Sequence, residues 1–293
     1  MQENIILNSP LLYNEDCITA MEKLINSPLK GAVDAIVVDL PYYGVVKDEF
    51  DNQWNSVGEY LDWVLRVFAD ASYLIKKNAN IIVFCSRQYA RYICNIFDDE
   101  CLWTEKRQII WARKRGFNNT RGHALASGYE PILYWCNGDK GTFNNVKIKP
   151  DTKRPEYTTG MLKDGVSLSD VWTDIPALPH NSKEKVAHPT QKPIKLMERI
   201  IEVFTNEGDT VLDFCMGSGS TGVACKNLNR DFIGIEIEEK YYKIAVKIIL
   251  YCNITPALMR VFFFMKIIFY IGVFMHEKNL SLAGIHRTHN IKQ

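Results

Sequence analysis

The sequence predicts an α/β fold in which helices cover both faces of a mostly parallel sheet. Short apolar runs rich in β-branched residues, such as 32–40 and 231–237, are typical of strands that are buried on both faces. Amphipathic helical segments alternate with these runs, and such alternation favours parallel pairing. A glycine-rich turn at 217–222 follows one strand and opens a helix, where α/β folds commonly bind ligands.

Residue spacing predicts the elements of the first half of the chain. A long helix is expected at 58–77, because apolar residues from Leu61 to Tyr73 recur at helical spacing. A strand is expected at 129–136, and the missing N–H of Pro131 predicts an edge strand or the start of a strand. The other expected elements are a helix at 17–27, strands at 32–40, 80–86 and 101–113, a helix at 87–97 and a loop at 114–128.

The second half begins with an irregular stretch at 137–187. Gly, Asn, Asp, Thr, Ser and Pro dominate it, which predicts a small loop-rich insert. A helix is expected next, because Pro193 suits a first helical position and Gly208 suits a helix end. The remaining elements are strands at 210–214 and 231–237 and helices at 220–228 and 238–250.

Composition excludes several classes of protein. The 293 residues are 47% hydrophobic with a formal net charge of +1, so a mainly disordered chain is excluded. Eight cysteines without a CxxC pair predict neither a zinc site nor a disulfide framework, and a cytoplasmic protein is expected. The N-terminus has no signal-peptide pattern. Segment 106–154 holds eleven Lys or Arg and three Asp or Glu, so its charge is +8 and that of the rest is −7. Together with the motifs below, this block favours a surface that faces nucleic acid over a merely solvated face.

The turn at 213–222, DFCMGSGSTG, predicts a cofactor that carries a nucleoside. It contains G-x-G-x-x-G, and Glu236 ends the next strand, where an acid can accept hydrogen bonds from ribose hydroxyls. Asp213 would attract the ammonium and sulfonium groups of S-adenosylmethionine and repel the pyrophosphate of a nicotinamide dinucleotide. The turn alone leaves both cofactors open.

A second motif, Asp39-Leu40-Pro41-Tyr42, ends the strand at 32–40. It resembles the Asp-Pro-Pro-Tyr motif of the DNA amino-methyltransferases. The segments YNEDC at 13–17, VW at 171–172 and HPTQKP at 188–193 also resemble that family, and their order is that of its permuted (beta) class. The resemblance covers roughly residues 10–250. It implies a Rossmann-like methyltransferase fold with a circularly permuted motif order.

The resemblance also implies a domain organisation. It divides the chain into a catalytic half at 1–111, a target-recognition insert at 112–185, a cofactor-binding half at 186–251 and a C-terminal extension of unknown role at 252–293. The apolar stretch 257–275 contains Arg260 and Lys266, which favours packing on the domain over a membrane anchor. An appended or out-of-frame extension stays open as a third interpretation.

The implied reaction is methyl transfer from S-adenosylmethionine to an exocyclic base amine. By resemblance, the Asp39 carboxylate and the Leu40 backbone carbonyl accept the two N–H groups, and Tyr42 stacks on the flipped base. Leu40 replaces the usual proline, yet it offers the same carbonyl, and Pro41 still keeps Leu40 extended. Aspartate in the first position favours adenine N6, while cytosine N4 stays open.

Further site residues follow from the resemblance. Thr190 and Lys192 are expected near the carboxylate of the cofactor's methionine part, and Asp16 near its adenine, although a helix-cap role competes for Asp16. The predicted cofactor-binding set is Asp16, Thr190, Lys192, Asp213, Phe214, Gly217, Ser218, Gly219, Thr221 and Glu236. The predicted DNA-binding set is Arg113, Lys114, Arg115, Asn118 and Arg121, and no metal ligand is predicted.

The leading interpretation is therefore a sequence-specific adenine-N6 methyltransferase that acts on double-stranded DNA. A cognate restriction endonuclease is the further partner considered, and no membrane is expected. The alternatives are N4-cytosine methylation, methylation of RNA or of a protein amide, a nicotinamide oxidoreductase based on GSGSTG and Glu236, and a DNA-binding module that has lost catalysis.

Overall fold

The computed structural model describes residues 9–44, 51–117, 127–149, 163–179 and 181–251. Except for the last two, these residues belong to one compact unit, Met1–Ile249. A second unit, Leu250–Gln293, contains the predicted extension 252–293, which lies outside the described residues. Within the described part, no helix has the length and apolar character needed to cross a membrane.

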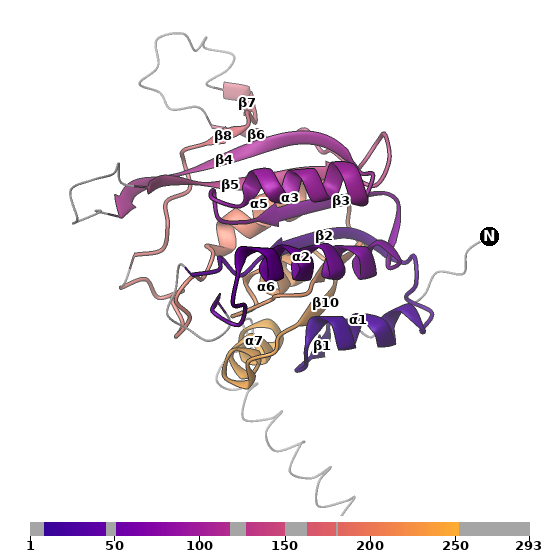
Figure 1. Cartoon of the computed structure of the whole chain (residues 1–293). Helices are drawn as coiled ribbons and strands as arrows, with labels where there is room; N and C mark the ends of the chain where they lie inside the picture. Colours follow the sequence, from indigo (N-terminus) through magenta and orange to yellow (C-terminus); the bar gives the residue numbers. More distant parts are fainter. Residues whose placement is uncertain (1–8, 45–50, 118–126, 150–162, 180, 252–293) are drawn as a thin grey trace, which may run out of the picture. The chain divides into compact units, whose positions relative to one another are not determined.

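An eight-stranded sheet forms the centre of the first unit, in the order β1-β10-β9-β2-β3-β5-β4-β8 (Figure 1). The strands from β1 to β3 in this order are parallel, β5 runs antiparallel to both of its neighbours, and β8 is parallel to β4. The strands are β1 (Leu11–Tyr13), β2 (Val33–Asp39), β3 (Ile75–Phe84), β4 (Thr104–Phe117), β5 (Ser127–Cys136), β8 (Val171–Trp172), β9 (Thr210–Asp213) and β10 (Asp231–Ile235). A separate antiparallel pair joins β6 (Lys147–Ile148) to β7 (Val166–Ser167).

Helices cover the two faces of the sheet as two separate groups. One face is packed by α1 (Cys17–Ile25), α2 (Val57–Ser72) and α3 (Ala90–Asn95), which a π-helical turn, η2 (Ile96–Glu100), extends. The other face is packed by α5 (Ile194–Phe204), α6 (Ser220–Asn227) and α7 (Glu239–Tyr251). This mostly parallel, three-layered arrangement confirms the predicted fold class (Figure 1).

The alternation of side chains along the central strands explains the two cores. In β3, Ile81 and Val83 pack against the helices α1–α3, whereas Ile82 and Phe84 pack toward α5 and α6. All four are fully buried. A strand with both faces buried needs an unbroken apolar run, which is the pattern that identified these strands in the sequence.

The chain order brings the two predicted motifs together. β2 comes from the N-terminal part of the chain, yet it pairs with β9 from the C-terminal part. The strand that ends in Asp39 therefore lies beside the strand that ends in Asp213. Because parallel strands place their carboxyl ends at one edge, both carboxylates reach the same side of the molecule.

Some element boundaries differ from the sequence-based expectations. The helix expected at 58–77 ends at Ser72, because β3 already begins at Ile75. The interpretation of 129–136 as an edge strand is wrong, since β5 lies between β3 and β4, while its alternative as the start of a strand holds. Pro131 is tolerated there because the pairing of β5 with β3 begins only at Ile132, opposite the last residue of β3. The strand β1 had not been predicted.

The predicted target-recognition insert, 112–185, does not coincide with a separate body in the described residues. Its first boundary falls inside β4, and β5 belongs to the main sheet. The loop expected at 114–128 is shorter, because β4 continues to Phe117 and β5 starts at Ser127. The division of the chain into functional regions stays a prediction.

Candidate active site

One pocket collects the residues of both motifs. It contains about 980 Å³ of space, including open solvent. The four predicted catalytic residues line it, and so does the predicted cofactor-binding set apart from Gly219. The topology thus brings together segments that are up to about 200 residues apart in the chain, around Asp16, Asp39, Lys192 and Asp213.

The glycine-rich turn has the conformation that only glycine adopts readily. Gly217 and Gly219 have φ angles of +51° and +86°. A Cβ atom on Gly217 would lie 2.9 Å from Nε2 of His188, so the backbone also needs glycine for close packing. The predicted turn between a strand and a helix is therefore present, and Gly219 supports α6 behind the pocket.

Two carboxylates fix this turn from within. Asp213 accepts hydrogen bonds from the backbone N–H of Cys215 at 3.1 Å and from the Thr221 hydroxyl at 2.6 Å. Glu236 accepts from the backbone N–H of Gly217 at 2.9 Å and of Glu238 at 2.8 Å. Each carboxylate keeps further lone pairs for a ligand, because an ionised carboxylate has about four acceptor positions.

Burial makes these carboxylates harder to ionise. Desolvation raises the pKa of Asp213 to about 7 against the opposing hydrogen bonds, and it also raises the pKa of Glu236. Among the described residues that line the pocket there are five Asp or Glu and a single Lys or Arg, Lys192. The pocket therefore suits a cationic ligand and is poorly suited to a pyrophosphate.

Asp39 lies at the end of β2 and lines the pocket. Its Oδ2 accepts a hydrogen bond from Nζ of Lys192 at 2.6 Å. Its Oδ1 is buried and has no hydrogen-bond partner among the described residues. The neighbouring backbone is held in place, because Leu40 N donates to Phe84 O at 3.1 Å and the Tyr60 hydroxyl donates to Pro41 O at 2.9 Å.

Lys192 contacts the catalytic motif in the structure. Its ammonium donates to Asp39 and to the Tyr42 hydroxyl at 3.0 Å, and its side chain is 6% exposed. Its backbone carbonyl accepts from the Ser220 hydroxyl at 2.9 Å, so the segment 188–193 also supports the glycine turn. The expected contact of Lys192 with a cofactor carboxylate stays a prediction, as does that of Thr190, which lines the same pocket.

Two other predicted positions, Asp16 and Phe214, combine a structural contact with a place at the pocket. Asp16 caps α1 by accepting from the N–H groups of Ile18 and Thr19, and it also lines the pocket. Phe214 is buried and packs edge-on against Phe68, with ring centroids 5.3 Å apart. For Asp16, the helix cap and the place at the pocket are therefore both compatible with its position, and the cofactor contacts of the two residues stay predictions.

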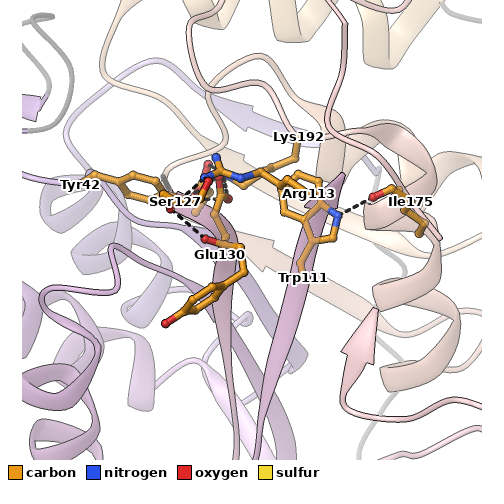
Figure 2. Close-up of polar contacts among 9 residues, drawn as sticks. Tyr42, Trp111, Arg113, Ser127, Glu130, Ile175 and Lys192 are labelled. Atoms are coloured by element: carbon orange, nitrogen blue, oxygen red, sulfur yellow. Dashed lines mark hydrogen bonds and ion pairs between the residues drawn. The ribbon is translucent and has the colours of Figure 1, made fainter. Parts of the chain in front are cut away.

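Glu130 is a site residue that the sequence analysis did not identify. It lies on β5, next to Pro131, and its carboxylate contacts Arg113, Lys192 and the Tyr42 hydroxyl (Figure 2). The available signal was one of the three acids within the basic block, near the start of a predicted strand. Nothing in the local pattern indicated that β5 would lie beside the catalytic motif.

The predicted DNA-binding residues are described only in part. Arg113 has a side chain that is 10% exposed and forms an ion pair with Glu130 at 2.6 Å. It also donates to the Ser127 backbone carbonyl at 3.3 Å (Figure 2). Asn118 and Arg121 lie outside the described residues, as do the side chains of Lys114 and Arg115. A role of these residues in DNA binding stays a prediction.

Comparison with known proteins assigns this pocket to a family. The family model described as DNA methylase matches residues 33–247, which include both motifs and β5. The chain belongs to the DNA methylase family. The predicted family and the predicted class of enzyme, a DNA methyltransferase, are thereby confirmed.

Individual members of the family are similar over most of their length. The type II methyltransferase M.HpaI of Haemophilus parainfluenzae is 30% identical over 234 residues, covering 78% of this chain and 71% of the relative. The DNA adenine methyltransferase YhdJ of Escherichia coli is 31% identical, covering 74% of this chain and 76% of the relative.

Solved structures agree with this assignment. The crystal structure of the M1.HpyAVI–SAM complex has a TM-score of 0.59 and 31% identity, covering 81% of this DNA methylase and 97% of that chain. The cytosine-N4-specific PvuII methyltransferase has a TM-score of 0.65 at 18% identity, which supports the common fold alone. The Rossmann-like fold of the sequence-based prediction is therefore confirmed.

Proposed function

We propose that this DNA methylase transfers the methyl group of S-adenosylmethionine to the N6 amine of adenine in double-stranded DNA. The observation that carries the proposal is Asp39, which lines the pocket that also contains the glycine-rich turn and whose buried Oδ1 has no hydrogen-bond partner among the described residues. A base amine needs acceptors in its plane, and this carboxylate offers one. Family membership and the relative crystallised with SAM support the cofactor.

The residues of the pocket fit S-adenosylmethionine. Asp213, Glu236 and Asp16 line the pocket together, and we expect Asp213 to face the charged part of the cofactor and Glu236 its ribose. A nicotinamide dinucleotide fits less well, because Lys192 is the only Lys or Arg among the described lining residues and is paired with Asp39. When bound, the cofactor supplies an electrophilic methyl group on a sulfonium.

The chain's own residues position the amine for attack. Asp39 accepts one amine N–H and, by family resemblance, the Leu40 carbonyl accepts the other, which favours a more tetrahedral and nucleophilic nitrogen. Tyr42 provides an aromatic face for a base that has left the duplex. Most of the rate enhancement is expected from this positioning and from the fixed charges around the base.

Adenine is preferred over cytosine on two grounds. By resemblance, aspartate in the first position of the tetrapeptide is typical of the adenine enzymes, and a relative that is 31% identical is named a DNA adenine methyltransferase. We also propose a cognate restriction endonuclease as a partner of this methyltransferase. It is supported by relatives that are named type II methyltransferases.

The test is methyl transfer from radiolabelled S-adenosylmethionine to methylation-free DNA, with the product digested to nucleosides. Label is expected in N6-methyladenine, and Asp39→Asn is expected to lower the rate by at least about 100-fold, since it replaces the charged acceptor of the reacting amine by a neutral amide with an NH2 donor. Asp62→Asn, which changes an exposed aspartate on α2, is the matched control and is expected to retain activity.

The other outcomes would change the proposal in defined ways. Label in N4-methylcytosine would keep the mechanism and replace the base. Label that is lost after ribonuclease or protease treatment would indicate RNA or protein as substrate. An unlabelled product from protein that binds S-adenosylmethionine would refute the proposed activity.

A further inference from the structure

The carboxylate of Glu130 connects three segments of the chain at the active site. Its Oε1 pairs with Arg113 of β4 at 2.6 Å, and its Oε2 lies 3.4 Å from Nζ of Lys192. The same Oε2 accepts a hydrogen bond from the Tyr42 hydroxyl at 3.2 Å. The Glu130 side chain is 14% exposed, so these contacts are made away from bulk water.

The two partners on the Oε2 side belong to the site that binds the base. Lys192 pairs with Asp39 of the catalytic motif and donates to the hydroxyl of Tyr42, which is itself part of that motif. The ring of Tyr42 lies 5.2 Å from the Lys192 ammonium, so the ring and the cation are fixed together. Glu130 therefore contacts both Lys192, which pairs with Asp39, and Tyr42, the residue proposed to stack on the base (Figure 2).

Charge explains why a second carboxylate matters here. Lys192 is buried between Asp39 and Glu130, so its single positive charge is shared by two anions. Without Glu130, the ammonium would pair with Asp39 alone and reduce its capacity to accept a hydrogen bond from an amine. Arg113 supplies a second positive charge, so the two carboxylates, Asp39 and Glu130, are balanced by two cations. This pairing lowers the desolvation cost of burying the four side chains.

We propose that Glu130 is a positioning residue for methyl transfer, which shares the Lys192 ammonium with Asp39 and anchors the hydroxyl of Tyr42. Asp39 then remains a strong acceptor for the target amine, and the Tyr42 ring stays oriented for the base. This inference rests on the proposed function and assigns a role to a residue outside both sequence motifs.

The electrostatics around Asp39 give the proposal a distinctive readout. Burial raises the pKa of Asp39, Lys192 lowers it, and Glu130 raises it again. The other groups that face Asp39 are the Tyr42 hydroxyl, the Cys85 thiol after β3, Asp213 at the end of β9 and the Cys215 thiol after it. When the negative charge of Glu130 is removed, the Lys192 ammonium interacts with Asp39 alone, so the pKa of Asp39 should fall.

The experiment measures the methylation rate of full-length enzyme at saturating DNA and S-adenosylmethionine as a function of pH. Glu130→Gln is expected to lower kcat by about tenfold or more, because small displacements of a catalytic group cost up to about 100-fold. The acid limb of its pH profile is expected to shift to lower pH, while the Kd for S-adenosylmethionine stays within about threefold of wild type. Glu130→Asp keeps the charge and is expected to restore the position of the limb.

A matched control and defined outcomes separate this role from a structural one. Glu105→Gln changes an exposed carboxylate on the adjacent strand β4 and is expected to leave kcat and the pH profile unchanged. An unchanged kcat and pH profile in Glu130→Gln would overturn the inference. So would a loss of activity in Glu130→Gln that merely parallels a loss of folded, cofactor-binding protein, with the acid limb of the remaining activity at its wild-type position. Inactive wild-type enzyme would refute the proposed function itself, and the inference with it.

Discussion

The carboxyl group of Asp213 couples ligand binding to pH at the scale of one residue. Because burial raises its pKa to about 7, the group is largely neutral below pH 6 and largely charged above pH 8. A neutral Asp213 does not attract a cation. We therefore predict that the affinity for S-adenosylmethionine increases with pH, with Kd falling by about tenfold between pH 5.5 and 7.5.

Isothermal titration calorimetry at several pH values checks this prediction. Glu236, whose pKa burial also raises, contributes to any pH dependence, so Asp213→Asn is needed as the comparison. The variant is expected to bind more weakly at pH 7.5 and to show a flatter pH dependence. A wild-type Kd that stays constant or rises with pH would contradict the proposed contact.

The sequence predicted the residues at strand ends better than the contacts between distant segments. Asp39, Asp213 and Glu236 were identifiable because each lies at the carboxyl end of a buried strand, and parallel strands place such residues at one edge. The pairing of Lys192 with Asp39 spans 153 residues, and the contact between Glu130 and Tyr42 spans 88. Such contacts depend on strand order and register, which local patterns do not encode.

The turn between β9 and α6 tests how an element depends on glycine. The backbone of Gly219 has a φ of +86°, and a Cβ atom added to it would lie 2.9 Å from the Cβ of Ala245 in α7. We predict that Gly219→Ala lowers the free energy of unfolding by about 1–2 kcal/mol from backbone strain. Overpacking should remove a further ~1–3 kcal/mol.

Gly208 provides the matched control for this prediction. Its φ is +82°, but a Cβ there would meet nothing within 4 Å. Gly208→Ala should therefore show only the strain contribution, of about 1–2 kcal/mol. Urea denaturation of the two variants isolates the packing contribution as their difference. Equal losses in both variants would show that contact with α7 adds nothing.

Element types were easier to predict than element ends. The long helix and the buried strands followed from periodicity, whereas α2 ended early because Ile75 already belongs to β3. The strand β1 is only three residues long, and it forms because Leu11–Tyr13 pairs with the edge of β10. A three-residue segment has no distinctive sequence pattern, and its strand conformation is determined by the strand with which it pairs.

At the scale of the whole molecule, the permuted order ties the two ends of the compact unit into one sheet. β2 pairs with β9 on one side and with β3 on the other, so the first and last thirds of the unit share hydrogen bonds and both cores. The sequence predicted this order only through the resemblance of its motifs to a family. The physical patterns by themselves predicted strands without their arrangement.

This shared sheet predicts that Met1–Ile249 unfolds cooperatively and that the cofactor stabilises all of it. The pocket is formed by α1, the ends of β2 and β9, and the segment before α5, so a bound ligand contacts both halves of the unit. At 100 times its Kd, S-adenosylmethionine should stabilise the folded state by about 2.7 kcal/mol. For a unit of this size, that corresponds to a rise in Tm of about 5–10 °C.

Two spectroscopic signals can follow this transition independently. Tryptophan fluorescence reports on six residues, whereas far-ultraviolet circular dichroism reports mainly on the helices. Four of the six lie in or beside β4, β5 and β8, namely Trp103, Trp111, Trp135 and Trp172, and two, Trp54 and Trp63, lie in or near α2. Both signals are expected to give one Tm and the same increase with cofactor. If fluorescence instead showed an early transition that the cofactor leaves unchanged, β4 and β5 would form a separate folding unit. The contact of Glu130 with the active site would then depend on docking between units, because the strand that carries it would unfold apart from the strand that carries Asp39.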